Sequence, residues 1–194
     1  MCCSNHHKSR KHHSDRKPFL KIGLGIGASL LLLGAGYGYW GNRQTAKAAL
    51  LKYSPQDVVY NQPLRASHLH NLGTETPIPF LPKDQPQPAI ALSETTYDFG
   101  SVGPKDVVKR TVAIRNTGKA PLTISKAYTT CGCTTADFTS TVIPSGKVAL
   151  VTVTFDAGFH DTRGMQVRRG VMIENNDPNQ SKAEIWVTAN VRQS

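Results

Sequence analysis

Residues 183–191 read Ala-Glu-Ile-Trp-Val-Thr-Ala-Asn-Val, with an apolar side chain at every odd-numbered position. Successive side chains of a β-strand point to opposite faces, so this period of two is typical of a strand with one buried face. The alanines, isoleucine and valines would enter a core, and Trp186 would lie on the opposite side with the polar residues. The sequence therefore predicts a half-buried strand near the C-terminus.

The same alternation recurs upstream, in short runs separated by turn-forming residues. The apolar positions of these runs are Val108, Val112 and Ile114, then Leu122 and Ile124, then Val151, Val153 and Phe155, then Val171 and Ile173. The turns between them contain Asn116-Thr-Gly118 and Pro144-Ser-Gly146. Several short, turn-bounded strands within about 100 residues predict an all-β fold, a single immunoglobulin-like β-sandwich. We place this domain at residues 93–194.

A set of motifs in this region also resembles a known family. The motifs, in order, are Tyr97-Asp-Phe-Gly100, Ile114-Arg-Asn-Thr-Gly118, Cys131-Gly-Cys133, Ile143-Pro-Ser-Gly146 and Asn175-Asn-Asp-Pro178. Together they are similar to a bacterial family of unknown function built on the Hydin-type immunoglobulin-like domain, whose fold is related to major sperm protein and PapD-type sandwiches. The resemblance spans residues 90–192. It implies the fold and an extracytoplasmic binding or scaffolding role, and it implies no reaction.

An uncharged stretch near the N-terminus predicts an anchor in the cell membrane. Residues 22–40 contain no charged side chain and end in Tyr37, Tyr39 and Trp40. A helix of this length covers about 28 Å, the thickness of a hydrocarbon core, and aromatic residues favour the membrane interface. Residues 1–21 carry six Lys or Arg side chains and one Asp. The positive-inside rule then keeps this basic tail in the cytoplasm and places the C-terminal domain outside.

A cleaved signal peptide is the competing interpretation of this segment. Ala46-Lys-Ala48 fits a cleavage pattern, but the apolar stretch is longer than the usual signal-peptide core, so we favour a retained anchor. Gly23 with Gly27 and Gly34 with Gly38 have the small-xxx-small spacing that lets two helices approach closely. The predicted helix could thus pair with a second copy and make a homodimer, although glycine is common in membrane helices in general.

Proline dominates the segment between the predicted anchor and the predicted domain. Residues 41–92 hold seven of the twelve prolines, most of them between residues 76 and 88. Proline fixes the backbone and removes a hydrogen-bond donor, which favours an extended, semi-rigid chain. We therefore expect a Pro-rich extracytoplasmic linker that holds the domain away from the bilayer.

The charge distribution limits the classes of partner and of reaction. The chain has a net charge of +10, and residues 1–21 alone contribute +5. The basic character is thus partly a property of the tail, and neither zinc-finger spacing nor an aromatic-interleaved basic run accompanies it, so we expect no nucleic-acid partner. The sequence also lacks the G-x-S-x-G, P-loop and H-E-x-x-H motifs of common enzymes. His160-Asp161 beside Arg163 is expected to form a surface loop.

Cys131-Gly-Cys133 is the strongest candidate for chemistry, and three interpretations stay open. Outside the cytoplasm the pair could form a disulfide, since Gly132 permits the bend that brings the two Cα atoms within range. Two thiolates on one face could instead bind a soft metal such as copper or zinc. His160, Met165 and Met172 are the nearby residues whose type suits such a site. The pair could also simply stabilise a loop, without chemistry.

These observations favour two functional classes. The first is a binding or scaffold module without catalysis or a cofactor, whose partner is a protein of the cell envelope met by a sheet face or an edge strand. Trp186 is the candidate contact in this class, although packing under a loop would also explain it. The second is an envelope thiol redox or soft-metal handling protein that acts through Cys131 and Cys133.

Overall fold

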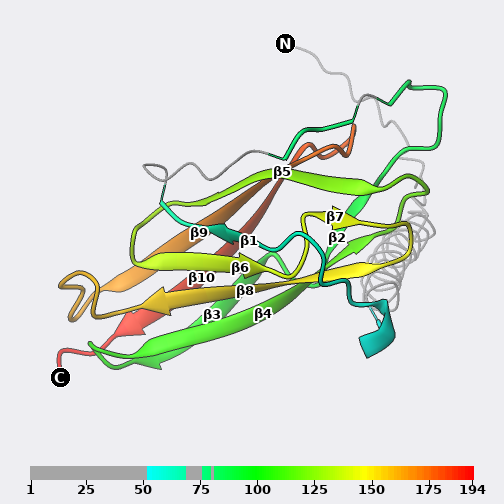
Figure 1. Ribbon diagram of the computed structural model, residues 1–194. Helices are drawn as coiled ribbons and strands as arrows, with labels where there is room; N and C mark the ends of the chain where they lie inside the picture. The colour runs from blue at the N-terminus through cyan, green and yellow to red at the C-terminus, as the bar shows by residue number, and fades with distance from the viewer. Residues whose placement is uncertain (1–51, 69–75, 80) are drawn as a thin grey trace, which may run out of the picture. The chain divides into compact units, whose positions relative to one another are not determined.

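Figure 1 shows the computed structural model of the chain, which describes residues 52–68, 76–79 and 81–194. The predicted cytoplasmic tail and the predicted membrane helix at residues 22–40 lie outside the described residues. So do the four glycines of that helix, Gly23, Gly27, Gly34 and Gly38. Within the described ranges, no helix is long and apolar enough to cross a bilayer.

The described part of the chain consists of strands and one short 3-10 helix. In order these are η1 (Pro55–Asp57), β1 (Leu64–Ala66), β2 (Ile90–Leu92), β3 (Thr96–Val102), β4 (Val107–Asn116), β5 (Leu122–Thr129), β6 (Thr134–Phe138), β7 (Val142–Ile143), β8 (Val148–Asp156), β9 (Gln166–Asn175) and β10 (Lys182–Val191). The ten strands form two five-stranded sheets, with the orders β1-β6-β8-β4-β2 and β3-β10-β9-β5-β7. Neighbouring strands run antiparallel except β3 and β10, which are parallel. The expected all-β sandwich is confirmed.

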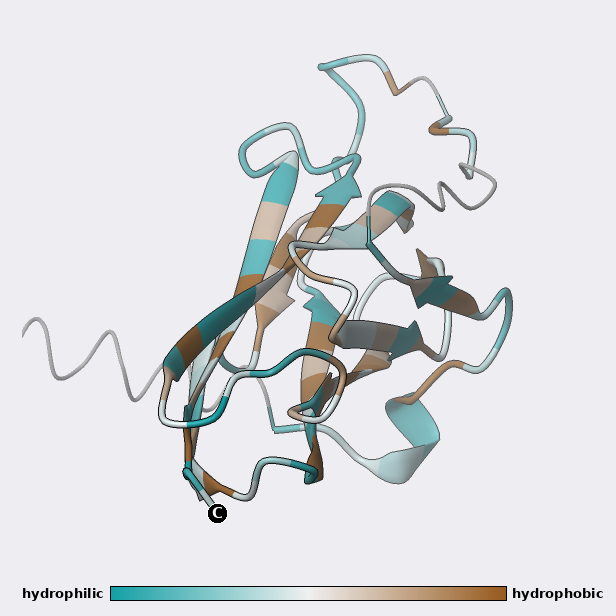
Figure 2. Cartoon of the chain, turned by 90° about the vertical axis from the view of Figure 1, so that its left-hand side faces the viewer, coloured by the Kyte–Doolittle hydropathy of each residue, from teal (hydrophilic) through white to brown (hydrophobic). Residues whose placement is uncertain are grey.

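The core lies between the two sheets and follows the alternation in the sequence. On β10, Ala183, Ile185 and Val187 are buried, whereas Lys182 and Glu184 are exposed. Figure 2 shows the resulting bands of apolar and polar residues along the strands. A smaller cluster fills the end of the sandwich where β6 and β9 begin; it contains Val102, Cys133, Phe155, Ala157, Val167, Ala189 and Val191. This end cluster positions the cysteine motif.

Part of the segment expected as a linker packs into the sandwich. β1 pairs with β6, and Ala66 is only 1% exposed. Val59 and Leu64 pack against the main core, and the Val59 N–H donates to the Val148 carbonyl at 2.8 Å. Lys147 Nζ lies 3.0 Å from the Asp57 carboxylate, and this hydrogen bond lowers the pKa of Asp57 below its ordinary value.

β2 extends the same sheet on its other edge. Leu92 lies opposite Ile114 on β4, and both side chains are buried. The proline pattern assigns residues 41–92 to a linker, but β1 and β2 are strands of the domain. Each strand has three residues, which is too few for a period of two to show in the sequence.

Asn116 organises the turn after β4 from a fully buried position. Its Nδ2 donates to the carbonyls of Ala120 at 2.8 Å and Ile143 at 2.9 Å. Its Oδ1 accepts from the N–H groups of Gly118 at 2.9 Å and Ala89 at 3.3 Å. The Asn-Thr-Gly triplet is therefore a turn whose first side chain joins three separate chain segments.

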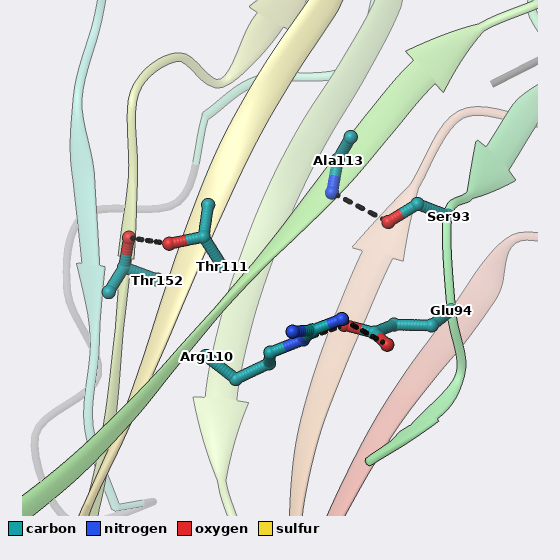
Figure 3. A network of polar contacts seen from close by, with 6 residues as sticks. All are labelled: Ser93, Glu94, Arg110, Thr111, Ala113 and Thr152. Carbon is teal, nitrogen blue, oxygen red and sulfur yellow. Dashed lines mark hydrogen bonds and ion pairs between the residues drawn. The ribbon is translucent and has the colours of Figure 1, made fainter. Parts of the chain in front are cut away.

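A polar network joins the segment between β2 and β3 to strand β4, as Figure 3 shows. Ser93 Oγ accepts from the Ala113 N–H at 2.9 Å. The Arg110 guanidinium forms an ion pair with Glu94, with Nη2 2.9 Å from Oε2. The hydrogen bond to this carboxylate raises the pKa of Arg110 above its ordinary value. The segment after β2 is thus held to β4 by side-chain contacts as well as by strand pairing.

Candidate functional site

The cysteine motif forms the loop between β5 and β6. In the structure a disulfide joins Cys131 and Cys133, whose Cα atoms are 5.2 Å apart. Residues two apart in an extended strand are separated by about 6.5–7 Å, so the chain bends here, as the glycine between them permits. The bend is a turn in which the Thr134 N–H donates to the Cys131 carbonyl at 3.1 Å.

Hydrogen bonds donated by backbone N–H groups hold this loop to two neighbouring strands. The Thr130 N–H donates to the Gly170 carbonyl at 3.0 Å, and the Gly170 N–H donates to Thr130 Oγ1 at 2.9 Å. On the other side, the Asp156 N–H donates to the Cys133 carbonyl at 2.9 Å. The loop is therefore fixed to β9 and to the end of β8 on either side of the disulfide.

The two sulfur atoms lie in different surroundings. Cys133 is 3% exposed and belongs to the end cluster, whereas Cys131 packs against that cluster but is only half-buried. Arg169 Nε donates to Cys133 Sγ at 3.1 Å. Arg169 is on β9 between Val167 and Val171, which are both buried, so its side chain shares their inward direction. A guanidinium thus contacts the inner sulfur of the pair.

An open pocket lies beside Cys131. It has a volume of about 620 Å³, and its walls include His68, Cys131, Gly132, Phe159 and Arg169 together with His160. The Phe159 ring covers Gly132 closely, because a Cβ at this glycine would lie 3.0 Å from the ring. His160 meets Phe159 edge to face with ring centroids 4.7 Å apart. Cys131 is therefore reached through a pocket with aromatic and cationic walls.

The loop that carries His160 matches the surface loop expected from the sequence. The Asp161 carboxylate accepts from Arg163 Nε at 2.8 Å and from Nη2 at 3.0 Å, and both side chains are exposed. These hydrogen bonds lower the pKa of Asp161 below its ordinary value and raise that of Arg163. The carboxylate that would have to orient His160 in a catalytic pair is thus bound to Arg163 instead.

The structure separates the residues named as soft-metal ligands. His160 lines the pocket beside Cys131, but Met172 is buried on β9, and Met165 is 55% exposed and lies outside that pocket. In the described residues, no group of three or more His, Cys, Asp or Glu side chains is arranged to hold a metal ion. Of the three named residues, His160 is the one that the structure places in the walls of the pocket beside Cys131.

Trp186 lies on the outer face of β10, as the alternation predicts, and is half-buried. The Arg168 guanidinium stacks over its ring, with Cζ 3.8 Å from the ring centroid. Its Nε1 donates to Glu184 Oε2 at 2.9 Å. Across the strand pair, the ring faces Gly170, where a Cβ would lie 2.8 Å from it. Trp186 is thus covered in part by its neighbours and open on its remaining side.

Sequence reasoning missed three residues of the cysteine site, namely His68, Phe159 and Arg169. The signal for Arg169 was present, since positions 167, 169 and 171 share one face of a strand and two of them are apolar. His68 and Phe159 come from distant segments, and no local pattern connects them with the motif. His68 is next to it because its backbone bridges Thr129 of β5.

The site and the sheets define an all-β sandwich domain with a cysteine pair in one interstrand loop. Residues 90–191 match the family model described as a protein of unknown function, DUF1573. The match covers more than half of the chain, and the chain belongs to this family. Comparison with curated proteins gives no match.

Several solved structures are similar to this chain. A protein of unknown function from Porphyromonas gingivalis W83 is 26% identical, with a TM-score of 0.49, covering 53% of this chain and 46% of that one. The chain therefore aligns with less than half of that protein's length. The ASH or PapD-like domain 7 of human CEP192 is 10% identical, with a TM-score of 0.42, covering 61% of this chain and 98% of the domain. The periplasmic chaperone SfaE is 13% identical, with a TM-score of 0.36, covering 55% and 59%.

Proposed function

We propose that the chain is a binding or scaffold module with a Hydin-type immunoglobulin-like domain, anchored in the cell membrane by one helix at residues 22–40. The N-terminal tail would lie in the cytoplasm and the sandwich outside it. In this proposal the module performs no catalysis and needs no cofactor. Its partners are the lipid bilayer and a protein of the cell envelope, and it has no nucleic-acid partner.

The observation that carries the binding proposal is the outer sheet face around Trp186. Here the Trp186 ring contacts both the Arg168 guanidinium and the Glu184 carboxylate on the exterior of β9 and β10. An open pocket of about 300 Å³ adjoins them, with Thr96 and Lys182 among its walls. Tryptophan and arginine are the side chains that contribute most at protein interfaces, so this face is the best-suited contact surface for a protein partner.

Crosslinking in membranes tests this surface. Trp186→Ala is expected to reduce the yield of crosslinked partner by at least about tenfold, because interface tryptophans are often binding hot spots. Tyr60→Ala is the matched control, since Tyr60 is an aromatic residue that is 71% exposed in a different part of the domain. Equal loss in the two variants, or no loss in either, would contradict a contact at Trp186.

The proposed topology has its own test. Protease added to spheroplasts is expected to remove the sandwich and leave a tag on the N-terminus protected, because the basic tail keeps the N-terminus inside. Immunoblots against the tag and against the domain measure the two ends separately. A domain that resists protease in spheroplasts but is cleaved after lysis would mean that the orientation is reversed.

The glycine spacing extends the proposal to a homodimer through the membrane helix. Gly23, Gly27, Gly34 and Gly38 would let two such helices pack closely. The crosslinking experiment reports this state as a species of twice the mass of the chain.

A second candidate function is favoured by the surroundings of the disulfide. Cys131 opens onto a pocket, and Arg169 donates to Cys133 Sγ. Both features are typical of cysteines that react, because nucleophilic thiolates need access and a nearby positive charge. The alternative function is therefore thiol redox exchange, or handling of copper or zinc by the reduced pair. Loss of the phenotype in Cys131→Ser and Cys133→Ser, with Trp186→Ala silent, would favour it over the scaffold.

A further inference from the structure

We propose that the Cys131–Cys133 disulfide exchanges with thiols of another protein in a fixed order. The incoming thiolate attacks Cys131, and Cys133 leaves as a thiolate beside Arg169. The inference rests on the second candidate function and adds to it a role for each sulfur, a role for Arg169, and a substrate class. That class is a protein with two neighbouring cysteine thiols.

The order of attack follows from access. Cys131 lines the open pocket, whereas Cys133 is 3% exposed and packs in the end cluster. A thiolate that attacks a disulfide must approach one sulfur along the line of the S–S bond. Cys131 is the less buried of the two cysteines and is the one that lines the pocket, so it offers the more accessible sulfur for such an approach. Phe159 forms an apolar wall there, which suits a cysteine flanked by apolar residues on the partner.

The position of Arg169 indicates which sulfur leaves as the thiolate. Its Nε donates to Cys133 Sγ at 3.1 Å, and its Nη1 donates to the Arg168 carbonyl at 3.0 Å. Among the described residues, no carboxylate forms an ion pair with this guanidinium. A Cys133 thiolate would give this half-buried cation a counter-ion. Because a stabilised thiolate leaves faster, Arg169 favours departure of Cys133 over departure of Cys131.

The loop does not depend on the disulfide for its position. Hydrogen bonds hold it, among them two between Thr130 and Gly170, one from Asp156 to Cys133, one from Thr134 to Cys131 and one from Thr129 Oγ1 to the Cys131 carbonyl. A bridge between residues two apart closes a very short loop and therefore removes little entropy from the unfolded chain. Opening it would leave the domain folded, so the bond is available for exchange.

The exchange balances in two steps. First, the partner thiolate forms a bond to Cys131 Sγ, the Cys131–Cys133 bond breaks, and its electron pair goes to Cys133 Sγ as a thiolate. Second, the partner's other thiolate attacks the partner sulfur of this mixed disulfide, and Cys131 leaves with the electron pair. The partner is oxidised to a disulfide, and this chain gains two electrons and, from the partner's thiols, two protons.

The rate of disulfide reduction tests the role of Arg169. The experiment uses the full chain with Cys2→Ser and Cys3→Ser, so that the motif holds its only two cysteines. Dithiothreitol is the probe, and alkylation followed by mass spectrometry counts the thiols. Arg169→Gln is expected to slow reduction about tenfold, because Cys133 becomes a poorer leaving group. Arg65→Gln, which removes the same charge from an exposed ion pair, is expected to change it less than about twofold.

A second variant keeps this test decisive if Arg169→Gln fails to fold. Arg169→Lys retains the charge beside the sulfur and is expected to stay within about threefold of the parent chain. Equal rates for Arg169→Gln and Arg65→Gln in folded protein would overturn the role of Arg169. So would a tenfold loss in Arg169→Lys, since the positive charge is then not what matters.

Single-cysteine chains test the order of attack. With oxidised glutathione as the probe, and with each rate divided by the thiolate fraction of its cysteine, Cys131 in the Cys133→Ser variant is expected to form the adduct at least about tenfold faster than Cys133 in the Cys131→Ser variant. Equal rates, or faster reaction of Cys133, would overturn the order. These results are separate from the phenotype of the two serine variants, whose silence would instead refute the second candidate function itself.

Discussion

A chain that begins at residue 76 is expected to lose about 3–5 kcal/mol of unfolding free energy relative to a chain that begins at residue 52. The shorter chain lacks Ala66, which is 1% exposed, and Val59 and Leu64, which pack against the main core. It also leaves β6 as an unpaired edge strand, since β1 is its outer neighbour. The segment before residue 68 is thus an integral part of the domain.

Urea unfolding of the two chains measures this difference. Ala66→Asp in the longer chain is expected to reproduce most of the loss, because it places a charge in the core where β1 packs. Tyr60→Ala is the control within the same segment, because Tyr60 is largely exposed and its removal should change the midpoint little. Coincident midpoints for the chains that begin at 52 and 76 would refute the packing of β1.

Asn116→Ala is expected to lower the unfolding free energy by about 3–4 kcal/mol. The side chain makes four hydrogen bonds from a fully buried position, and its loss leaves the Ala120 and Ile143 carbonyls without these donors. The N–H groups of Gly118 and Ala89 lose their acceptor as well. A buried polar group without a partner costs more than the bond itself contributes when made.

Asn190→Ala provides the control for this prediction. Asn190 is exposed on β10, so the same change of residue should alter stability by less than about 0.5 kcal/mol. Thermal or urea unfolding of both variants gives the comparison. If the two variants were equally stable, the turn after β4 would not depend on its asparagine.

The sequence alone predicts the long strands and fails on the short ones. In β8 the sequence alternates from Val151 to Asp156, and in β10 it alternates over all ten residues; the structure buries the apolar side of each. β1, β2 and β7 have three, three and two residues, and no period can be read from so few. Their places are set by tertiary pairing with β6, β4 and β5. The sequence therefore cannot separate β1 and β2 from the Pro-rich segment at residues 41–92.

The candidate site was predictable only where its residues are consecutive in the sequence. Cys131 and Cys133 are visible as a motif, and the bend at Gly132 follows from chain geometry. Met165 and Met172 share the chemistry of soft-metal ligands, yet one is exposed and the other is buried elsewhere on β9. Residue type identifies what could bind, whereas only the fold determines which side chains converge.

The two adjacent arginines of β9 have a consequence for how this strand can vary. Arg168 stacks on Trp186 at the outer face, and Arg169 reaches the inner sulfur, because the pleat sends neighbours to opposite sides. A shift of β9 by one residue against its neighbouring strands would exchange these destinations and turn Val167 and Val171 outward at the same time. A change of length confined to the loop before β9 leaves this register intact. Within β9, only a register shift by an even number of residues keeps each side chain on its present face.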